Sequence, residues 1–148
     1  RRQRQMCIRD SIWTQTRIIE DAVFGTDLTG ANIIVSGGLG MGSRENFKKL
    51  HTLADMLGAA VGASRAAVAA GYAGYAHQVG QTGVSVRPDI YIAFGISGAV
   101  QHLSGISGAK KIYAVNHDPK APIHEYADFS VIADCTSVLD KLIEKAGG

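Results

Sequence analysis

The sequence predicts an α/β fold built as a doubly wound parallel sheet of about five strands. Short runs of β-branched residues end at a glycine or a small polar residue, and each run is followed by a stretch in which apolar residues recur at helical spacing. The eighteen glycines lie mostly in clusters that separate these runs. Strands that alternate with helices form a parallel sheet, and a length of 148 residues suits a single domain.

The first strand, turn and helix show this pattern most clearly. A strand is expected at Asn32–Ser36, and Gly37–Gly42 form a glycine-rich turn after it. Ser43 is a preferred helix N-cap, the apolar residues after it recur at helical spacing, and Gly58 is placed to end the helix. Further strands are expected at Ala59–Ala63, Ile90–Phe94, Lys111–Asn116 and Phe129–Ala133, and helical segments at 65–70, near 97–103 and, after a cap at Thr136 or Ser137, up to Lys145.

Composition and charge argue against several classes of protein. The formal net charge is +2 and comes largely from arginines within residues 1–17, so the rest of the chain gives no support for nucleic-acid binding. The two cysteines, Cys7 and Cys135, form no CxxC motif, which argues against a disulfide scaffold or a zinc site. No apolar run approaches the roughly eighteen residues that a transmembrane helix needs. We therefore expect a soluble protein without a metal centre.

Ligands bind doubly wound sheets outside the carboxyl ends of the strands, so the residues after each strand are the candidates for a site. After the first strand, Ser36–Ser43 read SGGLGMGS, and the lack of side chains would let backbone N–H groups approach a phosphate. This is not a Walker A loop, because no Gly-Lys-Ser/Thr follows. A tight turn between strand and helix is the alternative interpretation.

Single polar residues follow three other strands. Ser64 and Arg65 stand where a nicotinamide site would carry an Asp or Glu for the ribose hydroxyls. A hydroxyl and a guanidinium instead suit a phosphate or a reduced flavin ring, although Arg65 is also a candidate for a surface ion pair. Asn116 and Asp134 end the fourth and fifth strands, and each is either a ligand contact or a helix or turn cap.

Two loops add further polar groups at the same edge of the sheet. Residues 78–83 read QVGQTG and supply two amides and a hydroxyl, although glutamine and threonine are also ordinary turn residues. Residues 95–102 read GISGAVQH, a second glycine-rich turn in which Ser97 and Gly98 would present N–H groups to a pyrophosphate. His102 would hydrogen-bond a carbonyl that carries negative charge, or else is a structural histidine.

Two other functions are consistent with parts of this pattern. Ser97 lies in GISGA, one residue from the G-x-S-x-G motif of serine hydrolases, and Asp118 and His124 follow in the expected chain order. An NADP-binding module of related architecture would place Arg65 on the 2′-phosphate.

Six segments together resemble the C-terminal domain of electron-transfer flavoprotein alpha subunits. In chain order they are GANIIVSGG, LGAAVGASRAAV, QVGQTG, RPDIYIAFGISGAVQHLSG, VNHDPKAPI and YADFSVIAD, and the similarity covers roughly Asp27–Lys145. The resemblance implies a Rossmann-like FAD-binding domain that acts as a redox carrier, without substrate turnover by this chain alone. Family members hold FAD between this domain and a beta subunit. They pass electrons from dehydrogenases, such as the acyl-CoA dehydrogenases of fatty acid β-oxidation, to a quinone oxidoreductase or another acceptor.

The resemblance also implies roles for individual residues. Arg65 would lie against the isoalloxazine ring, Thr82 would offer its hydroxyl to the flavin N5, and His102 would lie by the O2 carbonyl. Positive charge or hydrogen-bond donors in these places favour the reduced flavin. The other cofactor-binding residues that the match implies are Ser64, Gln78, Val79, Gly80, Gln81, Ser97, Gly98, Ala99, Val100, Gln101, Asn116 and Asp134.

Two residues near the cofactor depart from the family pattern. Leu39 stands in the first glycine loop where the family usually has an arginine, and Val84 follows QVGQTG where a lysine is common. Each difference removes a positive charge near the cofactor, so the resemblance implies FAD binding but does not fix the flavin affinity, the potential or the choice of partner.

The similarity also suggests how the chain is divided. We expect residues 1–11 to be a basic segment foreign to the family, whether an arm, a transit peptide or an artefact. Residues 12–26 would be a linker or the tail of an N-terminal domain that this chain lacks, and residues 27–148 the FAD-binding domain. The expected location is the bacterial cytoplasm, with the mitochondrial matrix as the alternative.

Overall fold

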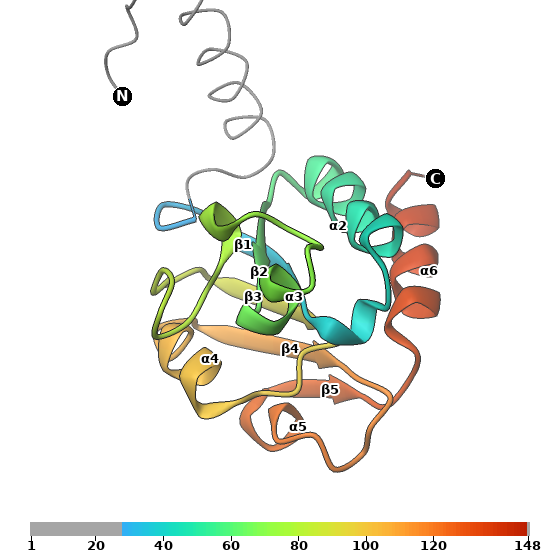
Figure 1. The fold of residues 1–148 in the computed structure, drawn as a ribbon. Helices are drawn as coiled ribbons and strands as arrows, with labels where there is room; N and C mark the ends of the chain where they lie inside the picture. Colours follow the sequence, from blue (N-terminus) through green and yellow to red (C-terminus); the bar gives the residue numbers. More distant parts are fainter. Residues whose placement is uncertain (1–27, 148) are drawn as a thin grey trace, which may run out of the picture.

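The computed structural model describes residues 28–147, which form one parallel sheet covered by helices (Figure 1). The sheet has five strands in the order β2-β1-β3-β4-β5, and every neighbouring pair is parallel. The predicted α/β fold class is therefore confirmed. The strands are β1 (Ile33–Gly37), β2 (Ala60–Ala63), β3 (Ile90–Phe94), β4 (Lys111–Val115) and β5 (Phe129–Val131).

A buried apolar cluster lies on each face of the sheet, as a doubly wound fold requires, although the edge strand β5 is exposed. The helices are α2 (Arg44–Leu57), α3 (Arg65–Ala69), α4 (Val100–Gly105), α5 (Ile123–Tyr126) and α6 (Cys135–Gly147), with short 3-10 turns η1 (Leu39–Met41) and η2 (Tyr75–His77). In β1, Ile34 joins one buried cluster and Val35 the other, because successive side chains of a strand point to opposite faces. Phe47 of α2 and Leu139 of α6 pack in the Val35 cluster, and Ile123 of α5 packs in the Ile34 cluster. Strands buried on both faces read as nearly continuous apolar runs, which is why their positions were predictable.

The ends of α2 match the sequence prediction. The Ser43 hydroxyl accepts a hydrogen bond from the Asn46 N–H at 3.1 Å, which satisfies one of the unpaired donors of the first turn. Gly58 ends the helix with a φ of +68°, a left-handed conformation that favours glycine. Local chemistry alone therefore sets both boundaries of this helix.

The start of α6 differs from the prediction. Thr136 and Ser137 lie inside the first turn of the helix, and the expected cap at one of them is wrong. Asp134 is the capping residue, because its Oδ2 accepts from the Ser137 N–H at 3.1 Å and from the Thr136 hydroxyl at 2.7 Å. A carboxylate accepts several hydrogen bonds at once, so it displaces the hydroxyl residues that follow it.

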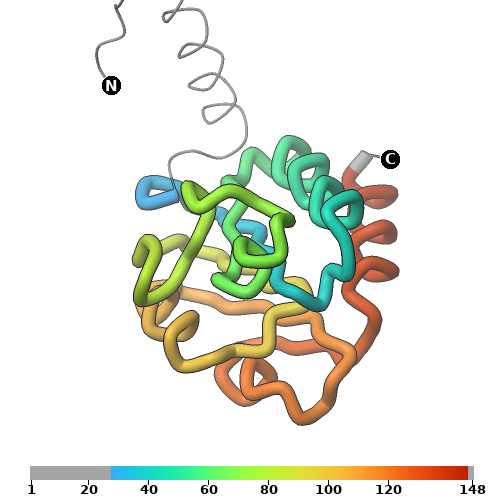
Figure 2. The backbone as a smooth tube through the Cα atoms, viewed as in Figure 1, coloured from blue at the N-terminus to red at the C-terminus, as the bar shows by residue number. Residues whose placement is uncertain are grey.

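The connection between β2 and β3 is the least regular part of the fold. Figure 2 allows the chain to be followed from β2 through residues 70–89 to β3. The Val79 N–H donates to the Ala63 carbonyl at 2.9 Å, which holds the middle of this connection beside the end of β2. Neither η2 in this connection nor the one-turn helix α5 was expected, because segments this short carry no periodic signal.

None of the helices within residues 28–147 has the length and apolar character that crossing a bilayer requires. The sequence expectations for residues 1–11 and 12–26, and for Cys7, fall outside the described residues.

Candidate functional site

The candidate site lies where the order of the strands reverses. β1 is followed in sequence by its neighbour β2, while β3 lies on the other side of β1, so the connections leave the sheet in opposite directions. The loops after β1 and β3 meet at this point. The Gly38 N–H donates to the Phe94 carbonyl at 2.9 Å, and the Gly40 N–H donates to the Gly95 carbonyl at 3.0 Å.

Glycine is required at this crossing because the two backbones touch. A Cβ on Gly38 would lie 2.5 Å from the carbonyl oxygen of Gly95, and a Cβ on Gly95 would lie 2.8 Å from the carbonyl carbon of Gly40. Gly95 also has a φ of +69°. Lack of a side chain therefore brings the loops together, which is a structural use of the first glycine loop.

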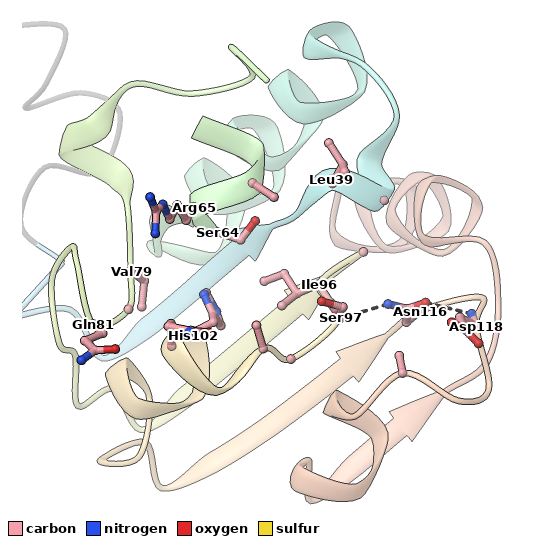
Figure 3. Close-up of a pocket in the computed structure, with 18 of the residues that line it drawn as sticks. Leu39, Ser64, Arg65, Val79, Gln81, Ile96, Ser97, His102, Asn116 and Asp118 are labelled. Atoms are coloured by element: carbon pink, nitrogen blue, oxygen red, sulfur yellow. Dashed lines mark hydrogen bonds between the residues drawn. The ribbon is translucent and has the colours of Figure 1, made fainter. Parts of the chain in front are cut away.

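A cavity of about 650 Å³ opens beside this crossing (Figure 3). This volume is in the range that holds a small organic ligand or a cofactor. Figure 3 shows Ser64 and Arg65 on one side of the cavity and Ser97 and His102 on the other.

Most of the predicted site residues come together around this cavity. The predicted residues that line the cavity are Leu39, Ser64, Arg65, Val79, Gly80, Gln81, Thr82, Ser97, Gly98, Ala99, Gln101, His102 and Asn116. Three predicted residues do not line it: Gln78, Val100 and Asp134. Val84, whose difference from the family was expected to matter near the cofactor, packs against the Ile34 cluster instead.

The sequence prediction missed part of the lining. The residues missed are Ala66, His117, Asp118, Pro119 and Ala121, while Gly40, Gly95 and Ile96 also line the cavity and belong to the two glycine-rich turns that the sequence singled out. Residues 117–121 follow β4, so the rule that ligands bind at the carboxyl ends of strands would have found them if it had been extended beyond Asn116.

The two glycine loops use their N–H groups differently. In the first loop the N–H groups of Gly38, Gly40, Met41 and Gly42 all donate to protein carbonyls, so this loop is a tight turn rather than a phosphate cradle. In the second loop, no hydrogen bond within residues 28–147 uses the N–H groups of residues 97–101. A run of unpaired N–H groups at a cavity wall is suited to an anion.

Arg65 has no ion-pair partner within the described residues, so the predicted alternative of a surface ion pair does not apply there. It begins α3, whose N-cap Ser64 accepts from the Ala67 N–H at 3.2 Å. The capped turn fixes the backbone at Arg65, and the guanidinium of Arg65 lies beside the cavity (Figure 3). An unpaired guanidinium in a cavity is available to an anionic or electron-rich ligand.

His102 is neutral in this setting. Its side chain is only 6% exposed, and burial lowers its pKa to about 4, against a small opposing influence of the Val79 backbone. The hydroxyl of the fully buried Tyr91 lies 2.7 Å from Nε2, and burial raises the pKa of Tyr91, so this hydroxyl stays protonated beside the imidazole. Nδ1 forms no hydrogen bond of normal geometry within residues 28–147, although the Val79 backbone lies close enough to the imidazole to oppose the lowering of its pKa.

Asn116 joins the loops after β3 and β4. Its Nδ2 donates to the Ile96 carbonyl at 3.0 Å and its Oδ1 accepts from the Asp118 N–H at 2.8 Å, as the dashed lines in Figure 3 mark. The side chain is 6% exposed. Asn116 therefore fixes the relative position of two loops that line the cavity.

Asp134 gives the first testable prediction. Hydrogen bonds from Thr136 and Ser137 lower the pKa of this exposed carboxylate. We expect Asp134→Ala to lower the midpoint of urea unfolding slightly, because the first turn of α6 loses its cap. FAD affinity should be unchanged, because Asp134 does not line the cavity. A loss of FAD affinity at unchanged stability would instead support the cofactor contact that the resemblance implied for Asp134.

Comparison with known proteins identifies the family. Residues 27–107 match the model of the electron transfer flavoprotein FAD-binding domain. The chain belongs to this family. Three similar relatives are electron transfer flavoprotein alpha subunits: the mitochondrial one of Oryza sativa subsp. japonica is 55% identical over 119 residues, that of Bacillus subtilis 51% over 128, and that of Paracoccus denitrificans 54% over 119. These matches cover 80%, 86% and 80% of this chain but 33%, 39% and 39% of the relatives, so the chain spans between a third and two fifths of their length.

A solved structure shares the fold alone. It is an X-ray structure from Mycobacterium smegmatis described as a thiamin diphosphate-dependent enzyme, with a TM-score of 0.51 and 14% identity over 88% of this chain and 27% of that one. At such low identity the likeness supports only the α/β architecture.

The cofactor of the family domain is FAD, and the cavity fits it. The N–H groups of residues 97–101 and the guanidinium of Arg65 have no partners within residues 28–147; the N–H groups suit a pyrophosphate, and the guanidinium suits an electron-rich ring. Nδ1 of His102 is buried and has no hydrogen bond of normal geometry within residues 28–147, and such a polar atom is available to a ligand or a water.

Proposed function

We propose that this chain holds FAD in the cavity and carries electrons as part of an electron transfer flavoprotein. The observation that carries the proposal is the coincidence, in one cavity at the strand switch point, of an unpartnered arginine and a run of unpaired N–H groups. Membership of the FAD-binding family supports it. The donors would be flavin dehydrogenases such as acyl-CoA dehydrogenases, and the acceptor a quinone oxidoreductase or a similar protein.

The residues of the chain would divide the work of binding. The N–H groups of residues 97–101 would hold the pyrophosphate, and Arg65 would hold the ring and favour negative charge on it. His102 would face the cofactor as a neutral imidazole, since burial lowers its pKa to about 4. Bound FAD would supply the electron-carrying chemistry, while the protein sets its position and electrostatics.

The exposure of the site supports a shared cofactor. Arg65, Gln81, Thr82, Ser97 and Gln101 all line the cavity and are exposed. A cofactor held only by these exposed residues would remain in contact with water on its other side, so a second protein is needed to cover it. We propose the beta subunit of the flavoprotein as this partner, with residues 1–11, 12–26 and 27–148 divided as the sequence suggested.

The proposal is tested by flavin binding. The protein, prepared alone and with a beta subunit, should show flavin absorbance or acquire it when FAD is added. FAD should raise the thermal unfolding midpoint more than NADPH, because the family model that the chain matches is that of an FAD-binding domain. Absence of flavin uptake in both preparations would refute the proposal, and a larger shift with NADPH would favour the alternative dinucleotide.

Replacing Arg65 should weaken FAD binding without affecting the fold. In Arg65→Met the exposed side chain loses a guanidinium that has no ion-pair partner within residues 28–147, so stability should change little. The dissociation constant for FAD should rise about tenfold or more, because hydrogen bonds to charged groups are worth roughly 1.5–3 kcal/mol. Quenching of flavin fluorescence measures this constant.

The matched control is Arg44→Met, which removes an exposed arginine of α2 that does not line the cavity. FAD affinity in this variant should equal that of the wild type. Equal affinity in both variants would show that Arg65 contributes nothing to the site.

The serine hydrolase alternative finds no support in the geometry. No hydrogen bond within the described residues joins Ser97 to His124, and neither ring nitrogen of His124 has a partner. Asp118 accepts from the Lys120 N–H in its own loop rather than orienting a base. In such a site the nucleophile would have to contact the base, and the base would have to contact the carboxylate that orients it.

We place the protein in the bacterial cytoplasm or the mitochondrial matrix, because the relatives include bacterial and mitochondrial alpha subunits.

A further inference from the structure

The loop of residues 78–84 holds Thr82 in a fixed frame. The Gly80 N–H donates to the Val84 carbonyl at 3.0 Å, and the Val84 N–H donates to the Gln78 carbonyl at 2.9 Å. A Cβ on Gly83 would lie 2.2 Å from the Gln78 carbonyl oxygen, so the loop closes tightly on itself. Thr82 is thereby presented at the cavity by a backbone with little freedom to move.

Thr82 is also held at two of its own oxygen atoms. Its carbonyl accepts a hydrogen bond from the hydroxyl of Tyr75, and its Oγ1 accepts one from Nε2 of Gln78 at 2.8 Å. Gln78 is only 4% exposed and does not line the cavity, although the sequence placed it among the cofactor contacts. Gln78 therefore contacts a cavity residue from behind.

This contact determines the direction of the Thr82 hydroxyl proton. A hydroxyl has one proton to donate and two lone pairs that accept. Because the Gln78 amide donates to Oγ1, the hydroxyl proton has to point elsewhere. No residue within 28–147 accepts it. An amide also does not titrate in the physiological pH range, so the arrangement does not depend on pH.

We propose that Gln78 is a positioning residue which turns the Thr82 hydroxyl proton into the cavity, so that Thr82 meets a bound flavin as a hydrogen-bond donor. This inference rests on the proposed function. Gln78 acts only through Thr82 and touches no part of the ligand. A carboxylate in place of the Gln78 amide would accept a hydrogen bond instead of donating one. The Thr82 hydroxyl would then donate its proton to this carboxylate and no longer to the flavin.

A double-mutant cycle on the flavin-loaded protein tests the coupling. The measured quantities are the reduction potential of the bound flavin and its visible absorption spectrum, in wild type, Thr82→Val, Gln78→Glu and the double variant. We expect Thr82→Val to shift both in the wild-type background. In the Gln78→Glu background, the shift in potential caused by Thr82→Val should be about one third of its wild-type size or smaller, because the hydroxyl no longer donates to the flavin.

Ser85→Glu is the matched control, since it adds the same charge to an exposed residue that follows the same loop but neither lines the cavity nor bonds to Thr82. The effect of Thr82→Val should be retained in full there. If Gln78→Glu does not fold, Gln78→Met removes the donor at similar length, and the Thr82→Val shift should again be reduced.

An undiminished Thr82→Val shift in the Gln78 variants, with flavin bound, would overturn this proposal alone. A wild-type protein that takes up no flavin would overturn the proposed function and this inference with it.

Discussion

Gly95→Ala should destabilise the protein by about 3 kcal/mol or more. Alanine at this position would adopt a φ of +69°, where a side chain is strained, and its Cβ would lie within 3 Å of three backbone atoms of Gly40 and Met41. Backbone atoms cannot move aside as a flexible side chain can, so the clash adds to the conformational strain. Urea unfolding followed by circular dichroism measures the loss.

Gly58→Ala separates the two contributions. Gly58 has a φ of +68°, almost the same as Gly95, but nothing lies within 4 Å of the position that its Cβ would take. This variant should lose only about 1 kcal/mol, the cost of the left-handed conformation. Equal losses in the two variants would mean that the close crossing of the loops after β1 and β3 contributes nothing to stability.

The second large effect concerns acid. His102 has an ordinary pKa of 6.5 in the unfolded chain and about 4 in the folded protein, so the unfolded state binds more protons between these values. Stability should therefore be fully present above pH 6.5 and should fall as the pH decreases towards 4. One pKa unit corresponds to about 1.4 kcal/mol, which gives a total loss from this residue of about 3 kcal/mol.

The measurement compares urea unfolding of the apoprotein at pH 7.5 and pH 4.5 in wild type and His102→Gln. Glutamine still offers polar atoms to Tyr91 but does not titrate, so the variant should lose less stability on acidification. His51→Gln serves as the comparison, because burial lowers the pKa of His51 in the same direction but this residue is less buried than His102. The prediction is contradicted if the wild type and His102→Gln lose the same amount.

Features with a local cause were predictable from the sequence. The five strands appear where apolar runs end at small residues, and β1, β2 and β3 have such runs because they are largely buried in the sheet, whereas the edge strand β5 is exposed. Ser43 and Gly58 mark the ends of α2 through their own side chain and backbone preferences. The rule that ligands bind beyond the carboxyl ends of strands brought most of the site together, although the roles of its residues remain predictions.

Features that depend on contacts between distant segments were not predictable. The first glycine loop has the composition of a phosphate cradle, but its N–H groups donate to neighbouring carbonyls, two of them across the crossing to Phe94 and Gly95. Gln78 lies in a motif of ligand-binding appearance, yet its amide is buried behind Thr82. Asp134 ends a strand at the edge where ligands bind, yet its carboxylate caps α6. In each case the partner of a polar group decides its role, and sequence spacing does not specify that partner.

The charged residues in the cavity lining nearly cancel. Among the lining residues, Arg65 is the one with a permanent positive charge, and Asp118 is the one with a carboxylate. A pyrophosphate placed against residues 97–101 would thus be neutralised mainly by oriented peptide dipoles rather than by cations. Dipoles at contact distance are screened much less by dissolved salt than separated charges are. The affinity of residues 97–101 for an anion should consequently depend on the backbone conformation of this turn, and little on the ionic strength of the solution.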